Sequence, residues 1–64
     1  MVEVSIKYIN NWDVILLTKE QYYELLRATE LHNSWFVYDN HLSKVTQAVN
    51  LSNVLYWRVG TEND

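Results

Sequence analysis

Residues 2–17 read VEVSIKYINNWDVILL, and this stretch sets the architecture of the chain. Apolar and polar residues alternate over positions 2–8, which is typical of a half-buried strand, and the aliphatic run at 14–17 indicates a second strand. Asn10-Asn11 between them suits a two-residue turn, because asparagine tolerates the positive φ that such a turn requires. We therefore expect the chain to open with a β-hairpin.

This hairpin is apolar on both faces, because successive side chains of a strand point to opposite sides. One face collects Val4, Ile6, Tyr8, Ile15 and Leu17. The other collects Ile9, Trp12, Val14 and Leu16, diluted by Ser5 and Lys7. If the loop has three residues instead, residues 14 and 16 exchange faces with residues 15 and 17. Two aliphatic side chains would still point away from the core. A single helix shields only one face of a sheet, so the second face predicts a further partner.

The chain after the hairpin begins a helix. Thr18-Lys19-Glu20-Gln21 matches a capping box, in which the threonine hydroxyl accepts from the amide of Gln21 and the glutamine side chain returns to the cap. The stripe expected to face the sheet consists of Tyr22, Leu25, Leu26 and Thr29, while Tyr23 and Arg27 lie on the opposite side. We expect the helix to end near residues 31–33, where Asn33 suits a left-handed C-cap.

The remaining sequence predicts further strands. We expect strands over residues 35–38, 44–49 and 54–59, a turn at 39–40, and either a short turn or a single helical turn at 50–53. The predicted fold is a single α+β domain over residues 1–60. It is a small antiparallel sheet of four to five strands with one helix packed on one face, in the order β-β-α-β-β. Residues 61–64 are expected to form a flexible polar tail.

Composition narrows the functional classes. The chain has 64 residues, no cysteine, and eight acidic against five basic residues, a net charge of −3. A domain of this size buries only about 60% of its extended-chain surface, so association is a plausible source of extra stability. No basic stripe suited to tracking phosphates is visible, so nucleic acid is not the expected partner. With no apolar run of membrane-spanning length and no signal-peptide pattern, we expect a cytoplasmic protein without a membrane partner.

The sequence offers no recognisable catalytic or cofactor site. It lacks a cysteine nucleophile, a Gly-x-Ser-x-Gly motif and a glycine-rich phosphate loop. His32, Asp39 and His41 are the best metal candidates, but their spacing is not that of a metal site. We therefore expect no enzyme activity, no catalytic residue, no cofactor and no bound metal.

The aromatic residues favour a binding role. Nine aromatic residues are many for so small a core, and Trp12 at the hairpin tip and Tyr23 on the polar side of the helix fit the core poorly. Tyr23 is also placed to lie against Arg27 one turn on. The predicted protein-binding residues are Ile9, Trp12, Val14, Leu16, Tyr23 and Arg27. We expect a non-enzymatic module that forms a homodimer or binds another protein. The alternative is a single-stranded nucleic-acid or DNA-binding regulatory domain that uses an aromatic sheet face.

Three segments of the sequence carry a resemblance to known proteins. The hairpin Tyr8-Ile9-Asn10-Asn11, the helix start Leu17-Thr18-Lys19-Glu20-Gln21-Tyr22 and the stretch Val49-Asn50-Leu51-Ser52-Asn53-Val54 together resemble short accessory proteins of phages and prophages of Gram-positive bacteria. The resemblance implies a protein that binds, and in some cases inhibits, a host or bacterial-defence protein. The last of these stretches is also similar to the end of LytTR-type DNA-binding domains, whose basic contacts this chain lacks.

Overall fold

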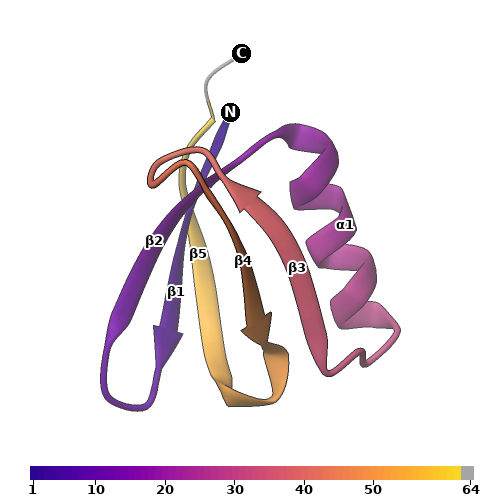
Figure 1. Cartoon of the computed structure of the whole chain (residues 1–64). Coiled ribbons are helices and arrows are strands. Elements are labelled where there is room, and N and C mark those ends of the chain that lie inside the picture. The colour runs from indigo at the N-terminus through magenta and orange to yellow at the C-terminus, as the bar shows by residue number, and fades with distance from the viewer. Residues whose placement is uncertain (63–64) are drawn as a thin grey trace.

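The computed structural model describes residues 1–62, which form one α-helix and five strands (Figure 1). The strands are β1 (Val2–Tyr8), β2 (Trp12–Leu17), β3 (Trp35–Asn40), β4 (Val45–Asn50) and β5 (Val54–Glu62). Helix α1 (Lys19–Glu30) follows β2, and a short 3-10 helix, η1 (Leu51–Asn53), leads into β5. The expected α+β class is confirmed, and of the two alternatives expected for residues 50–53 the structure has the helical turn.

The strands form two antiparallel sheets, so the prediction of a single four- to five-stranded sheet is wrong. One sheet has three strands in the order β2-β1-β5, and the other is the hairpin β3-β4. Helix α1 and this hairpin both pack over one face of the three-stranded sheet (Figure 1). Since a helix is only about 10 Å wide, it covers part of that face, and the hairpin covers the remainder.

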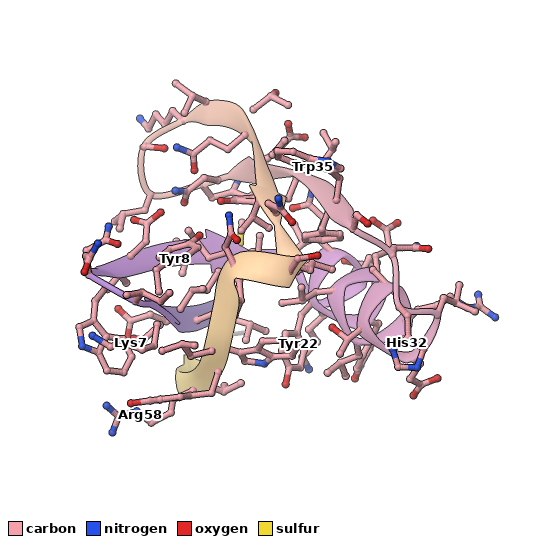
Figure 2. All side chains as sticks on the ribbon, turned by 90° about the horizontal axis from the view of Figure 1, so that it is seen from below. Lys7, Tyr8, Tyr22, His32, Trp35 and Arg58 are labelled. Carbon is pink, nitrogen blue, oxygen red and sulfur yellow. The ribbon has the colours of Figure 1, made fainter. Side chains whose placement is uncertain are left out.

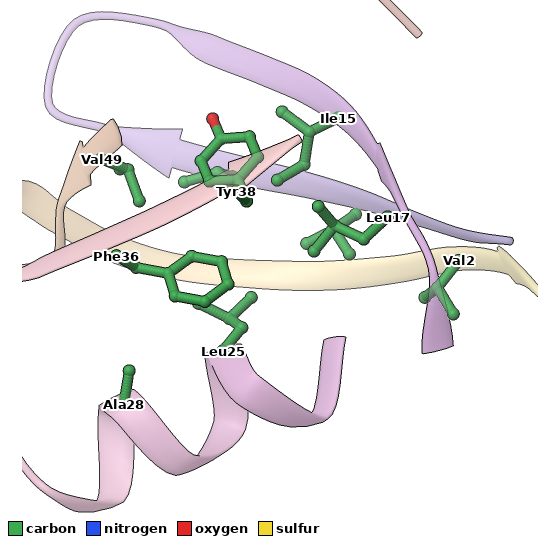
Figure 3. Close-up of a cluster of buried hydrophobic side chains, with 10 residues drawn as sticks. Val2, Ile15, Leu17, Leu25, Ala28, Phe36, Tyr38 and Val49 are labelled. Atoms are coloured by element: carbon green, nitrogen blue, oxygen red, sulfur yellow. The ribbon is translucent and has the colours of Figure 1, made fainter. Parts of the chain in front are cut away.

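The hydrophobic core lies between these two layers (Figure 3). The three-stranded sheet supplies aliphatic side chains, α1 supplies two residues, and the β3–β4 hairpin supplies two aromatic rings and a valine. The buried residues are Val2, Val4, Ile6, Ile15, Leu17, Leu25, Ala28, Phe36, Tyr38 and Val49. The alternation of residues 2–6 and the inward placement of residues 15 and 17 are therefore confirmed.

The first hairpin turns one residue earlier than expected. The N–H of Tyr8 donates to the carbonyl of Asn11 (2.9 Å), which makes Ile9-Asn10 the loop in place of Asn10-Asn11. Neither asparagine has a positive φ, so the predicted left-handed turn geometry is wrong. The loop still has two residues, and the same side chains therefore share each face as the sequence predicted.

Both ends of α1 are capped, although not entirely as expected. The hydroxyl of Thr18 accepts from the N–H of Gln21 (3.2 Å), which confirms the N-cap. At the other end His32, and not Asn33, takes the left-handed conformation (φ 56°). The N–H groups of these two residues donate to the carbonyls of Thr29 and Ala28, which is a Schellman motif.

The face of α1 toward the core is narrower than the predicted stripe. Leu25 and Ala28 are buried, and Tyr22 packs against them. Thr29 is exposed, and its hydroxyl donates to the carbonyl of Leu25 (3.0 Å). The predicted position of Thr29 on the buried stripe is therefore wrong, and Ala28 occupies that place.

A polar junction joins β2 to β3. Asn40, predicted in a turn, is instead the buried last residue of β3. Its Oδ1 accepts from the N–H of Leu16 (3.0 Å), and the N–H of His41 donates to the carbonyl of Leu16 (2.8 Å). In the orientation that satisfies both partners, the side-chain oxygen of Gln21 accepts from the N–H of Asp39 (3.0 Å) and its nitrogen donates to the Asp39 carbonyl (3.2 Å). The predicted return of this side chain to the N-cap is therefore wrong. These contacts cover part of the β2 edge.

Strand β5 is longer than the predicted closing strand. It continues to Glu62, so residues 61 and 62 belong to the sheet. The rest of the predicted polar tail, residues 63–64, lies outside the described residues. The register with β1 shifts near each end of β5, and the shift between Lys7 and Tyr8 pairs Val54 with Tyr8 and leaves Leu55 exposed. Val54 therefore packs against the core and Leu55 does not, so the two residues have exchanged the sides of the strand on which the sequence placed them.

Candidate functional site

The candidate site is the side of the three-stranded sheet that faces away from α1 and the β3–β4 hairpin, here called the outer face. The register of the strand pairs determines which side chains lie on this face. Lys7 stands between Trp12 on β2 and Tyr56 on β5, and Ser5 stands between Val14 and Arg58. Among residues 1–60, the register places on this face the side chains of Glu3, Ser5, Lys7, Trp12, Val14, Leu16, Tyr56 and Arg58.

Trp12 lies at the centre of a cluster of aromatic and cationic groups on this face. Its ring meets that of Tyr56 edge to face, with centroids 5.5 Å apart and an interplanar angle of 81°. The Lys7 ammonium lies 5.4 Å from the Trp12 centroid, and the guanidinium carbon of Arg58 lies 4.9 Å from it. Ser5 is small enough to let the Arg58 side chain cross β1 toward the indole. Both contacts fall within the range of cation–π attraction.

The outer face leaves large apolar side chains accessible. Trp12, Val14 and Tyr56 are 41%, 39% and 49% exposed, and Leu16 is half-buried. The packed core uses the other side of the same strands (Figure 3). The sequence predicted that this sheet has more apolar surface than one helix can cover. In the structure, these four side chains form a contiguous apolar group on the outer face.

The structure divides the six predicted binding residues into two groups. Trp12, Val14 and Leu16 lie together on the outer face, and Ile9 is exposed in the loop at its end. The other two residues lie on α1, which packs against the opposite side of the sheet. The six residues therefore do not form one continuous surface.

The two helix residues are exposed but are not paired as expected. The Tyr23 ring lies 6.2 Å from that of Tyr22 at an angle of 44°. The cation–aromatic contacts found within residues 1–60 both involve Trp12, so the expected contact between Tyr23 and Arg27 is not among them.

Sequence reasoning did not include Tyr56 or the two cations of the outer face, Lys7 and Arg58, among the predicted binding residues. Lys7 pairs with Trp12 within the first hairpin, where the sequence placed it on this face, whereas Tyr56 and Arg58 join them only because β5 pairs with β1. That second pairing joins opposite ends of the chain. The sequence did place Tyr56 and Arg58 on one side of the closing strand, which was the available signal. Lysine and arginine that looked scattered along the sequence are therefore neighbours on one indole ring (Figure 2).

A second exposed apolar group lies on the β3–β4 hairpin. Trp35 and Val37 point away from the core, with Ala48 of β4 beside Val37. Figure 2 shows Trp35 on the side of the molecule away from Lys7 and Arg58. This group has no cation–aromatic contact among residues 1–60, which distinguishes it from the outer face.

A polar network lies beside the core. The hydroxyl of Tyr38 and the Nδ2 of Asn40 both donate to Gln47 Oε1, at 3.2 and 3.0 Å. Burial, followed by the charges of Tyr8 and Asp13, raises the pKa of Tyr38 to about 12. Burial and then Asp13 also raise the pKa of Tyr8. Both tyrosines stay protonated at neutral pH, and the hydroxyl of Tyr38 acts as a hydrogen-bond donor in the fold.

The hollows on the described surface are small and open. One of about 270 Å³ lies beside Tyr8 and Ile9 at the hairpin loop, and one of about 250 Å³ lies beside His32 at the end of α1. Within residues 1–60, no three histidine, aspartate or glutamate side chains gather as a metal site would require. No helix in that range is long and apolar enough to cross a membrane.

Comparison with known proteins gives no relative from which a function could be transferred. No family model, curated protein or solved structure matches the chain. The functional argument therefore depends on the chemistry of the outer face.

Proposed function

We propose that this chain is a non-enzymatic protein-binding module that recognises its partner through the outer face. The observation that carries the proposal is the cluster of Trp12 with Tyr56, Lys7 and Arg58, flanked by exposed Val14. Tryptophan, tyrosine and arginine are the residues that most often dominate the binding energy of protein interfaces. The open hollows described above offer little exclusion of water, which supports binding over catalysis.

Two kinds of protein partner fit this proposal. One is a second copy of the chain, which would give a cytoplasmic homodimer. The other is a host or bacterial-defence protein that the chain inhibits, as the resemblance to phage and prophage accessory proteins implies. Either partner would cover apolar surface that the domain leaves exposed.

Single-stranded nucleic acid is the second candidate partner. The gathering of Lys7 and Arg58 on Trp12 favours it, because single-strand binders combine stacking rings with cations. The chain has a net charge of −3, however, and two cations do not form a groove that tracks a phosphate backbone. Protein binding is the stronger proposal.

The test compares two matched double variants. Trp12→Ala with Val14→Ser alters the outer face, and Trp35→Ala with Val37→Ser makes the same changes on the exposed side of β3. Each purified protein is examined by light scattering from micromolar to near-millimolar chain, and then as immobilised bait for host-cell extract. The proposal expects the first variant alone to lose the dimer or the captured protein. Equal behaviour of wild type and both variants in both assays would contradict it.

A further inference from the structure

We propose that the partner of the outer face is an extended acidic peptide segment that also carries apolar side chains, and not a second copy of the chain. This inference rests on the proposed function and names the chemistry of the partner. Three features support the inference: the charge of the outer face, the size of that face, and the edge of β5 that pairs with no other strand among the described residues.

The cations of the outer face lack a partner of opposite charge. Within residues 1–60, the contacts of the Lys7 ammonium and the Arg58 guanidinium are those with the Trp12 ring, and no carboxylate pairs with either. Among residues 1–60, Glu3 is the one acid on the face, and it lies next to Gly60, where an added Cβ would come within 2.9 Å of Glu3 Oε2. The part of the face formed by residues 1–60 thus carries two cations and one acid, a local charge of +1, on a chain of net charge −3.

This charge pattern disfavours self-association through the outer face. A symmetric dimer presents the same patch on both subunits, so two copies of Lys7 and two of Arg58 would enter one interface. Desolvating cations without opposite charges is costly. A partner with carboxylates would instead neutralise both groups without disturbing the apolar contacts around Trp12.

The size of the face fits a short segment better than a domain. Three strands about 4.8 Å apart and about 20 Å long present roughly 300 Å² in projection. A stable protein–protein interface buries about 800 Å² on each partner. The relief of the side chains makes the accessible area larger than this projection, but the outer face alone is still smaller than a standard interface between folded domains, whereas an extended peptide can cover it.

The edge of β5 gives such a peptide a place to pair. β5 is the last strand of its sheet and pairs with β1 alone, whereas side chains and the backbone of the β3 end cover part of the β2 edge. An extended segment added along β5 would gain main-chain hydrogen bonds and would place alternate side chains beside Tyr56 and Arg58. Nucleic acid cannot use a strand edge in this way, and this favours the peptide.

The experiment measures the affinity of the intact chain for defined probes by fluorescence anisotropy. The main probe is a labelled, end-capped peptide in which glutamate and leucine alternate, compared with the same peptide carrying glutamine for glutamate. Lys7→Gln and Arg58→Gln each remove one cation from the face, and Lys44→Gln removes one from the β3–β4 turn as the matched control. Far-UV circular dichroism verifies that each variant is folded.

The proposal expects the glutamate peptide to bind several-fold more tightly than the glutamine peptide. Lys7→Gln and Arg58→Gln should each weaken binding about two- to five-fold, because each removes one exposed ion pair, while Lys44→Gln leaves the affinity unchanged. Raising salt from about 50 mM to about 500 mM should weaken binding of the glutamate peptide, because ions screen exposed pairs.

Five outcomes would overturn the proposal. Equal affinity for the two peptides, or an equal loss in Lys44→Gln, would remove the role of the unpaired cations. Tighter binding of a short oligothymidylate that depends on Lys7 would assign the face to nucleic acid. A dimer disrupted by Trp12→Ala with Val14→Ser, with no peptide bound, would refute this inference and leave the proposed function standing. A monomer that binds none of the probes and captures no protein would refute both.

Discussion

Replacing Asn40 with alanine should be among the most damaging single changes outside the aliphatic core. Its side chain is buried and joins the two sheets. Oδ1 accepts from the N–H groups of Leu16 (3.0 Å) and Leu42 (3.1 Å), and Nδ2 donates to Gln47 Oε1 (3.0 Å). In the variant the Leu42 amide can turn to water because this residue is exposed, but the partly buried N–H of Leu16 loses its acceptor.

The cost follows from these three bonds. Each neutral hydrogen bond contributes about 0.5–1.5 kcal/mol, and a donor left unsatisfied in a buried position costs about 1–3 kcal/mol. The expected loss is about 2–3 kcal/mol. A chain of this length has a stability of roughly 3–10 kcal/mol, so the loss is a large fraction of the total. The melting temperature should fall by roughly 10–20 °C.

Urea unfolding followed by far-UV circular dichroism measures this loss. Asn50→Ala is the matched control, because Asn50 Oδ1 accepts one exposed N–H, from Ser52 (3.0 Å), and its loss should cost about 1 kcal/mol. A loss in Asn40→Ala no larger than in Asn50→Ala would refute the view that Asn40 holds β2 to β3.

Three further predictions concern the helix and the core. Leu25→Ala should cost about 2–4 kcal/mol in urea unfolding, because Leu25 is fully buried between α1 and the sheet. A loss below about 1 kcal/mol, half the smallest expected value, would contradict that packing. His32→Gly should raise stability by about 0.5–1 kcal/mol, because His32 holds a positive φ, whereas Asn33→Gly should not, and thermal melts of the two variants test this. Because the pKa of Tyr38 is raised to about 12 in the folded chain from 10.0, stability should fall as pH rises from about 10 to about 12, since only the unfolded chain loses this proton there. Urea midpoints at several pH values should show a smaller fall in Tyr38→Phe, and an equal fall in both proteins would contradict the assignment.

The sequence predicted local structure well because alternation and caps are local signals. Strand periodicity identified β1 and the inward faces of both strands of the first hairpin, and Thr18 marked the start of α1. The left-handed position at the end of α1 was misplaced by one residue. Asparagine favours the left-handed conformation intrinsically, but the two hydrogen bonds of the Schellman motif require that conformation one residue earlier, at His32.

The two-sheet arrangement and the composition of the outer face could not be predicted from the same signals. Both depend on which strands pair, and pairing between β1 and β5 joins residues about fifty positions apart. Asn40 illustrates the same limit. Its residue type indicated a turn, whereas its side chain satisfies a backbone amide of β2 that is distant in sequence. Trp12 was recognised from sequence as a poor core residue, but its contacts with Lys7 and Arg58 required the fold.

The most direct test of the outer face as a recognition surface is a map of amide chemical shifts. The isotope-labelled chain is titrated with the unlabelled peptide in which glutamate and leucine alternate. The account predicts that the largest shifts occur in β5 and around Lys7 and Trp12, together with the indole N–H of Trp12, while α1 changes little. Shifts concentrated around Tyr23 and Arg27 on α1, or around Trp35 on β3, would contradict it.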